Sequence, residues 1–213
     1  MADIQKAMKS FEKKGFGVHC FENGSDAAAY MKSQIHGCTI GFGGSKTVEA
    51  IGLYDALQED NEIFWHWKDV VYEELKKDDK EGQAKVHATR NKAMTADIYV
   101  CSANAVSETG EIVNIDGSGN RISSTLWGHK KVYFVVSRNK IMPSFEEAIW
   151  RARNVAAPLR ARSVHKQTPC AVGELKCYDC DHPDRVCRGM AVIWEPLRGQ
   201  EYEIVFIDED YGM

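Results

Sequence analysis

The chain has 213 residues, 44% of them hydrophobic, which is enough for one well-buried α/β domain and short for two. We therefore expect a single domain over residues 1–213. A formal net charge of −4 creates no general attraction for nucleic acid or an anionic membrane, so neither is expected as a partner. No apolar run reaches the roughly 20 residues of a membrane span, and the polar start lacks a signal-peptide core. The protein is therefore expected to be cytoplasmic.

Helical patterns and short apolar runs alternate through the first part of the chain. Residues 3–14 place apolar side chains at helical spacing and end at Gly15, and a second helix is expected after Ser25, a plausible N-cap. A highly charged helical stretch follows at residues 68–91. Strands are predicted at residues 16–21, 38–42 and 62–67.

A glycine-rich turn follows the predicted strand at residues 38–42. Between a strand and a helix, backbone N–H groups can face an anion, and Ser45 can cap the helix. The turn is neither a Walker A loop nor a dinucleotide fingerprint. A tight turn with a solvated lysine and a ligand-binding turn both fit the pattern formed by Gly43, Gly44, Ser45 and Lys46.

The stretch from residue 96 to residue 121 is where we expect the chemistry. A buried strand at residues 98–101 precedes a dense set of amide, carboxylate and hydroxyl side chains. Each of them alone is typical of an ordinary loop. Together they follow a strand end, which is where α/β sheets bind their ligands. We predict that a small anionic metabolite is bound here by Asn104, Asn114, Asp116, Asn120 and Arg121.

Residues 131–137 are β-branched and aromatic, which predicts a strand in the middle of the sheet. Asn139 and Lys140 lie at its carboxyl end and are assigned to the same ligand site. Strands that alternate with helical patterns predict an α/β fold with a mainly parallel sheet and helices on both faces.

The last elements are less regular. A helix is expected to begin at Pro143 and Ser144 and to end near Pro158. Residues 190–194 and 202–207 are expected to form a closing hairpin or strand pair.

Four of the seven cysteines gather in residues 170–187 with the spacing C-x6-C-x2-C-x6-C. A C-x2-C pair presents two thiolates to one metal, and the outer cysteines are near enough to complete a four-sulfur site. Such ligation suits zinc and an iron–sulfur cluster equally, and the spacing matches neither the usual zinc ribbon nor a ferredoxin. The predicted ligands are Cys170, Cys177, Cys180 and Cys187, whereas Cys20, Cys38 and Cys101 fall on strands and are expected to be buried and inert.

Several segments together resemble one known family. In chain order they are NAVSETGEIVNIDGSGNR, GHKKVYFVVSRNKI, TPC with the cysteine segment, and the acidic end DEDYGM. From about Ile40 to the C-terminus, the chain resembles the LUD (lactate-utilisation) domain family of the LutC/YkgG type. The resemblance implies the fold of glucosamine-phosphate deaminases, ribose-phosphate isomerases and CoA transferases (NagB/RpiA/CoA transferase-like). Because that fold uses the corresponding glycine-rich turn against its ligand, the resemblance also favours ligand binding by Gly43, Gly44, Ser45 and Lys46. It also implies organic-acid metabolism beside iron–sulfur oxidoreductase subunits, which favours a [4Fe–4S] cluster over zinc.

The tetrapeptide Ser-Glu-Thr-Gly at residues 107–110 resembles the Ser-Glu-Asn-Gly motif of class I CoA transferases, whose glutamate attacks an acyl-CoA thioester. A carboxylate at a strand end can act as a nucleophile or a general base, so Glu108 is the catalytic candidate.

Three functions stay open. The first is an oxidoreductase-associated protein that binds a small carboxylate or phosphate and a cluster. The second is a CoA or acyl transferase, or a sugar-phosphate isomerase-like enzyme, that uses Glu108 and carries a structural zinc. The third is a non-catalytic scaffold for an iron–sulfur partner. A homo-oligomer is compatible with each.

Overall fold

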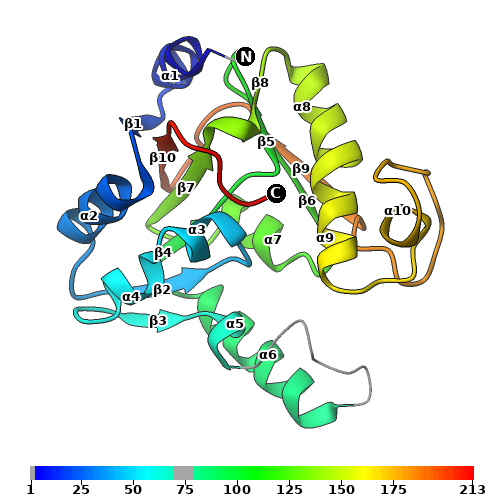
Figure 1. The fold of residues 1–213 in the computed structure, drawn as a ribbon. Helices are drawn as coiled ribbons and strands as arrows, with labels where there is room; N and C mark the ends of the chain where they lie inside the picture. The colour runs from blue at the N-terminus through cyan, green and yellow to red at the C-terminus, as the bar shows by residue number, and fades with distance from the viewer. Residues whose placement is uncertain (1–2, 70–78) are drawn as a thin grey trace.

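The computed structural model describes residues 3–69 and 79–213 (Figure 1). Its centre is a six-stranded sheet of order β1-β10-β7-β4-β2-β3 in which every pairing is parallel. The carboxyl ends of the strands therefore share one edge of the sheet, and the predicted parallel α/β sheet is confirmed. The strands are β1 (Gly17–Phe21), β2 (Thr39–Phe42), β3 (Glu62–Phe64), β4 (Ile98–Cys101), β7 (Lys131–Ser137) and β10 (Glu201–Ile207).

Helices cover both faces of this sheet. Phe134 and Phe206 pack on one face with Phe11 of the first helix, whereas Val135 and Val205 pack on the other face. This alternation is the period of two that a strand buried on both faces requires. None of the described helices is both long and apolar enough to cross a membrane. The helices of this part are α1 (Ile4–Lys13), α2 (Gly24–Gln34), α3 (Lys46–Ala50), α4 (Leu53–Leu57), α5 (His66–Asp69), α6 (Lys80–Ala93) and α7 (Asn120–Leu126).

A second, four-stranded sheet of order β8-β5-β6-β9 packs beside the first (Figure 1). It contains β5 (Ala105–Ser107), β6 (Ile112–Asp116), β8 (Ile141–Met142) and β9 (Gly189–Ile193). One long helical stretch covers it, with a π-helical segment, η2 (Ala152–Ala156), between α8 (Phe145–Arg151) and α9 (Ala157–Ser163). A 3-10 turn, η1 (Arg138–Lys140), precedes β8, and α10 (Pro169–Val172) opens the cysteine segment.

The predicted closing strand pair is wrong. Strand β9 pairs antiparallel with β6 in the small sheet, and β10 lies between β1 and β7 in the large one. The reason is burial, because residues 202–207 are buried without interruption and a strand of this kind requires neighbours on both sides. In β9 only Ile193 is fully buried, which suits a sheet edge.

Three local predictions also differ from the structure. Strand β3 ends at Phe64, and the indole rings of Trp65 and Trp67 stack with centroids 5.6 Å apart instead of sharing a strand face. Asn23, not Ser25, caps α2, since its side chain accepts from the Asp26 N–H. Pro158 does not end the helix, because it lies inside the continuous helical stretch just after the π-helical segment η2, where the helical hydrogen-bond pattern changes. Within the predicted helical stretch 68–91, residues 70–78 lie outside the described residues.

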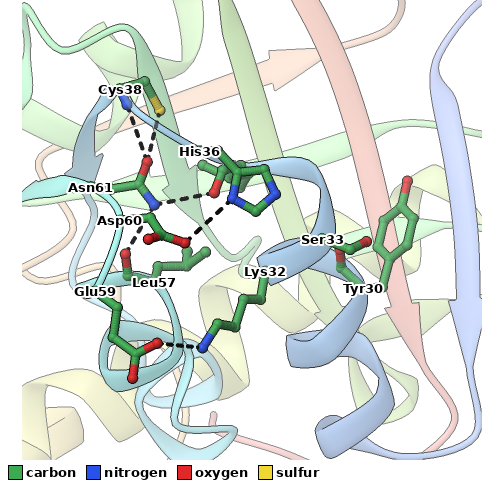
Figure 2. A network of polar contacts seen from close by, with 10 residues as sticks. Tyr30, Lys32, Ser33, His36, Cys38, Leu57, Glu59, Asp60 and Asn61 are labelled. Carbon is green, nitrogen blue, oxygen red and sulfur yellow. Dashed lines mark hydrogen bonds and ion pairs between the residues drawn. The ribbon is translucent and has the colours of Figure 1, made fainter.

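Figure 2 shows the polar network that holds the start of β2. The side-chain amide of Asn61 donates to the backbone carbonyls of Ile35 (3.1 Å) and Leu57 (2.9 Å). Its oxygen accepts from the Cys38 N–H at 3.2 Å and from the Cys38 thiol at 3.3 Å. Burial raises the pKa of the Cys38 thiol, and it does the same for Cys20 and Cys101. These three thiols are therefore protonated at neutral pH. Only Cys101 is fully buried, Cys20 on β1 is partly exposed, and Cys38 precedes β2 instead of lying on it, so the prediction of three buried strand cysteines holds for Cys101 alone.

Candidate functional site

A cavity of about 250 Å³ opens at the carboxyl edge of the six-stranded sheet. It is lined by the segments that follow β2, β3, β4 and β7, by the end of β6 and by residues of α6, α7 and α9. The structure thus gathers residues from distant parts of the chain at one place. Of the residues predicted to bind a ligand, those that line the cavity are Gly44, Ser45, Lys46, Asn104, Asp116, Asn120, Arg121 and Lys140.

Three other predicted ligand residues do not line the cavity but support those that do. Asn114 accepts a hydrogen bond from the Asn104 N–H (3.2 Å), and the Asn139 carbonyl accepts from the Arg151 side chain (2.9 Å). Gly43 precedes the lining turn, where an added Cβ would lie 2.9 Å from the Tyr99 hydroxyl oxygen.

The lining is strongly cationic. Asp116 is the one acidic side chain among the described lining residues, and its carboxylate accepts backbone N–H groups of Ser118 (3.1 Å), Arg121 (2.9 Å) and Ile122 (3.3 Å). Burial alone would raise the pKa of Asp116, but the Arg121 charge and these N–H groups hold it below its ordinary value. Asp116 is therefore ionised and already engaged. The basic lining residues are Lys46, Arg90, Arg121, Lys140, Arg160 and Lys166.

The side chain of Arg121 is held in place by the loop after β4. Its guanidinium donates to the Ile115 carbonyl (2.7 Å) and to the Asn104 side-chain oxygen (3.1 Å). The same Asn104 oxygen accepts from the Ile115 N–H at 2.6 Å. Arg151, buried behind the cavity, donates to the Asn104 carbonyl. A guanidinium fixed in this way presents its remaining N–H groups without a large entropic cost on binding.

Trp67 contacts two other basic residues of the lining. The Lys46 Nζ atom lies 4.9 Å from the Trp67 ring centroid, and the Arg160 guanidinium carbon lies 5.2 Å from it. Ser45 caps α3 by accepting from the Val48 N–H at 3.2 Å, so the predicted cap is confirmed. A Cβ at Gly44 would lie 3.0 Å from the Trp67 ring, so glycine allows the indole to approach the turn this closely.

Lys140 and His66 are the two buried titratable bases of the lining. The Lys140 Nζ atom donates to the Thr47 hydroxyl (2.6 Å) and the Ser102 hydroxyl (3.0 Å). Burial, with the charges of Arg151 and Arg121, lowers the pKa of Lys140 to about 7. Burial, with the charges of Arg90 and Arg160, lowers the pKa of His66 to about 3, so this imidazole is neutral at physiological pH.

Comparisons with known proteins agree with this architecture. The LUD domain family matches residues 4–207. The chain belongs to the LUD domain family. Among solved structures, it is similar to the crystal structure of a DUF162 family protein from Deinococcus radiodurans, with a TM-score of 0.51 and 13% identity over 96% of this chain and 95% of that chain. At this identity the likeness shows the fold. No curated protein matches the chain.

In this LUD domain, Glu108 lies away from the cavity. It occupies the turn between β5 and β6, and its carboxylate accepts from the Asp3 N–H (2.7 Å) and pairs with Lys6 (2.8 Å). The hydrogen bond from Lys6 is the main reason that the pKa of Glu108 is lowered. Asp3 is the N-cap of α1. Glu108 therefore holds the start of α1 in place. It does not line the cavity that the predicted ligand residues line.

The neighbouring residues of the Ser-Glu-Thr-Gly segment serve the other end of the same helix. The hydroxyls of Ser107 and Thr109 both donate to the Glu111 carboxylate. Glu111 in turn pairs with Lys14, the C-cap of α1, at 2.6 Å. The turn from β5 to β6 thus holds α1 at both ends.

The four cysteines of residues 170–187 all line a second, smaller cavity of about 20 Å³. Among the described residues, no three His, Cys, Asp or Glu side chains are close enough together to hold a metal ion, so the structure does not show the predicted centre. Two guanidinium groups contact the sulfurs. Arg153 lies 3.6 Å from the Cys177 sulfur, and Arg185 lies 3.6 Å from the Cys187 sulfur.

Some lining residues are not among the predicted ones. Ser102, Arg160 and Lys166 carry no motif, and Arg160 belongs to a helix that the sequence places beyond a proline. Of these, Ser102 alone carries a signal in the sequence, because it directly follows a buried strand and α/β sheets bind ligands at strand ends.

Proposed function

We propose that this LUD domain binds a small organic acid in the cationic cavity and acts in organic-acid metabolism of the lactate type. The observation that carries the proposal is the charge imbalance of the lining, in which five cationic side chains and the Lys140 amine, with its lowered pKa, face one acidic side chain that is already engaged. A cavity of about 250 Å³ suits a metabolite of a few carbon atoms.

The chemistry of the lining supports an acid with a carbon skeleton over a bare inorganic anion. Guanidinium groups such as those of Arg121 and Arg160 match carboxylate and phosphate oxygens. Apolar side chains share the walls with these cations, which gives a short hydrocarbon segment a surface to contact. They are Ala103, Ile115, Ala156, Ala157, Val164 and Val186.

The test is isothermal titration of the purified protein with lactate and, separately, with inorganic phosphate. In Arg160→Gln we expect the affinity for lactate to fall by about tenfold, since one charge-assisted hydrogen bond contributes about 1.5 kcal/mol or more. The matched control is Lys85→Gln, because Lys85 is exposed on α6, pairs with Glu81 and does not line the cavity. Equal affinities of both variants and wild type, or absence of binding, would reject the proposal.

We also propose that Cys170, Cys177, Cys180 and Cys187 hold a metal centre, with a [4Fe–4S] cluster favoured and zinc as the alternative. Their common cavity supports the proposal, as do the two guanidinium groups that can offset thiolate charge. Metal binding is coupled to the arrangement of its ligands, so a metal would draw together the four thiols that line this cavity. A cluster would supply one-electron chemistry, and zinc would stabilise the segment.

The position of this second cavity fits the LutC/YkgG-type role beside iron–sulfur oxidoreductase subunits. Ala157 and Val186 line both cavities. A centre held by the cysteines would therefore lie directly behind the wall of the organic-acid site.

A further inference from the structure

We propose that Lys140 is a nucleophilic amine that forms an imine with the carbonyl group of a small 2-oxo acid held in the cationic cavity. This inference rests on the proposed function, because the cavity must first bind the acid. The inference adds a covalent step and a substrate class to the proposed function.

The first argument is the location of the amine. Lys140 is 4% exposed, follows the central strand β7 and lines the cavity. Among the described residues, no carboxylate forms an ion pair with it. Its charged form would stand close to two guanidinium groups, those of Arg121 and Arg151, so the environment favours the neutral amine.

The second argument is the hydrogen-bond arrangement at the nitrogen. A neutral amine has two N–H bonds and one lone pair. Nζ donates at 2.6 Å to Thr47 and at 3.0 Å to Ser102. Both hydroxyls are acceptors here because their own protons are directed elsewhere. That of Thr47 is donated to the Tyr211 carbonyl (3.3 Å) and that of Ser102 to the Ala103 carbonyl (3.4 Å).

The two N–H bonds are therefore used and the lone pair is left over. A third proton on the nitrogen would have no acceptor among the described residues, and this agrees with the lowered pKa of about 7. Lysine amines that are desolvated beside other cations are the ones that act as nucleophiles toward carbonyl groups. The cationic side chains of the lining would bind the carboxylate of the 2-oxo acid whose carbonyl group reacts with Lys140.

The step is balanced without an added oxidant or reductant. The Nζ lone pair forms a bond to the carbonyl carbon, and the carbonyl oxygen leaves as water with the two N–H protons. The imine nitrogen then takes one proton from solvent. The resulting N–H can again be donated to Thr47 or Ser102.

The experiment is reductive trapping of the full-length protein with sodium cyanoborohydride and either pyruvate or glyoxylate, followed by peptide mass mapping. We expect one reduced adduct, on Lys140, whose yield rises as the pH is raised through neutrality. Lys46 and Lys166, the two other lysines of the lining, are internal controls. Adducts spread equally over these and surface lysines would overturn the proposal.

Lys140→Gln is the informative variant because its amide keeps two N–H donors for Thr47 and Ser102 but lacks the amine. It should lose the adduct and keep a cooperative thermal transition. Lactate serves as the matched ligand, because it has the carboxylate of pyruvate with a hydroxyl in place of the carbonyl. If wild type binds lactate and pyruvate in titrations and neither 2-oxo acid is trapped at Lys140, this inference fails and the proposed function stands. If no acid binds, both fail.

Discussion

The Nζ atom of Lys140 lies 2.6 Å from the hydroxyl oxygen of Thr47, and the two residues come from segments that follow β7 and β2. This contact joins two parts of the carboxyl edge at the point where the cavity opens. It also places an amine, rather than a carboxylate or a thiol, at a buried position of the lining.

The stability of the protein should depend on pH through Lys140. Its pKa falls from the ordinary 10.5 to about 7 in the folded chain, so the unfolded chain binds more protons between these values. The free energy of unfolding therefore rises with pH across this interval, by up to about 1.4 kcal/mol per pH unit from this group. Of the titratable groups that act on Lys140, Cys101, with a pKa of about 12, stays neutral across this interval, and burial lowers the pKa of Arg151 to about 10, so that its charge is lost only toward the upper end.

Urea denaturation at about pH 7.5 and about pH 9.5 measures this effect. The difference in unfolding free energy between wild type and Lys140→Gln should shift in favour of wild type at the higher pH. A difference that is the same at both pH values would mean that Lys140 is charged in the folded protein.

Glu108→Ala should destabilise the protein without weakening binding of an organic acid. The variant loses the acceptor for the Asp3 N–H and the partner of Lys6. We expect a loss of about 1 kcal/mol, because the Lys6 end of this contact is exposed and screened. Thermal denaturation and lactate titration are the two measurements. A large loss of binding or of any activity with a normal melting temperature would support Glu108 as a catalytic residue.

The metal content should depend on the cysteine segment alone. After anaerobic purification, Cys177→Ser with Cys180→Ser should lose the bound metal and, for a cluster, the broad absorbance of thiolate-ligated iron. Cys20→Ser and Cys38→Ser should keep both, since Cys20 lies on β1 and Cys38 directly precedes β2, and neither belongs to the cysteine segment. Metal that survives in the double variant would place the centre elsewhere.

Gly41→Ala should be strongly destabilising for a purely steric reason. A Cβ at residue 41 would lie 2.3 Å from the Ala93 carbonyl oxygen, at the end of α6. The helix would have to move away from β2, at a cost of about 1 to 3 kcal/mol. Gly189→Ala is the control because the nearest atom to its added Cβ is 3.6 Å away. Similar melting temperatures of the two variants would contradict this packing.

The sequence predicts the large sheet well because its strands are continuous apolar runs. It misses the small sheet, since β5 is a three-residue strand and β6 carries Asn114 and Asp116 among its apolar residues, so that both resemble loop. It also misplaces β9 and β10. Two strands that are adjacent in the sequence usually form a hairpin. Here β10 is instead buried between two strands from distant parts of the chain, and β9 joins the small sheet.

The same small sheet explains why Glu108 lies far from the predicted ligand residues. Asn104 precedes β5 and Asp116 ends β6, so both stand at the open end of this hairpin, next to the cavity. Glu108 lies in the turn at its closed end. At about 3.3 Å per residue, three or four residues of strand carry it roughly 10 to 13 Å away. The sequence does not reveal that β5 and β6 form a hairpin with Glu108 at its far end. It does allow the prediction that loops after parallel strands meet at one edge of the sheet.

The most direct measurement of the central claim is a crystal structure of the protein grown with lactate or pyruvate. The account predicts density for the acid inside the cavity, with its carboxylate contacting basic lining residues such as Arg121 or Arg160. For pyruvate without a reductant, the density should approach Nζ of Lys140. Density only on the outer surface, or an empty cavity at a concentration that saturates binding in solution, would contradict the assignment of this cavity as the organic-acid site.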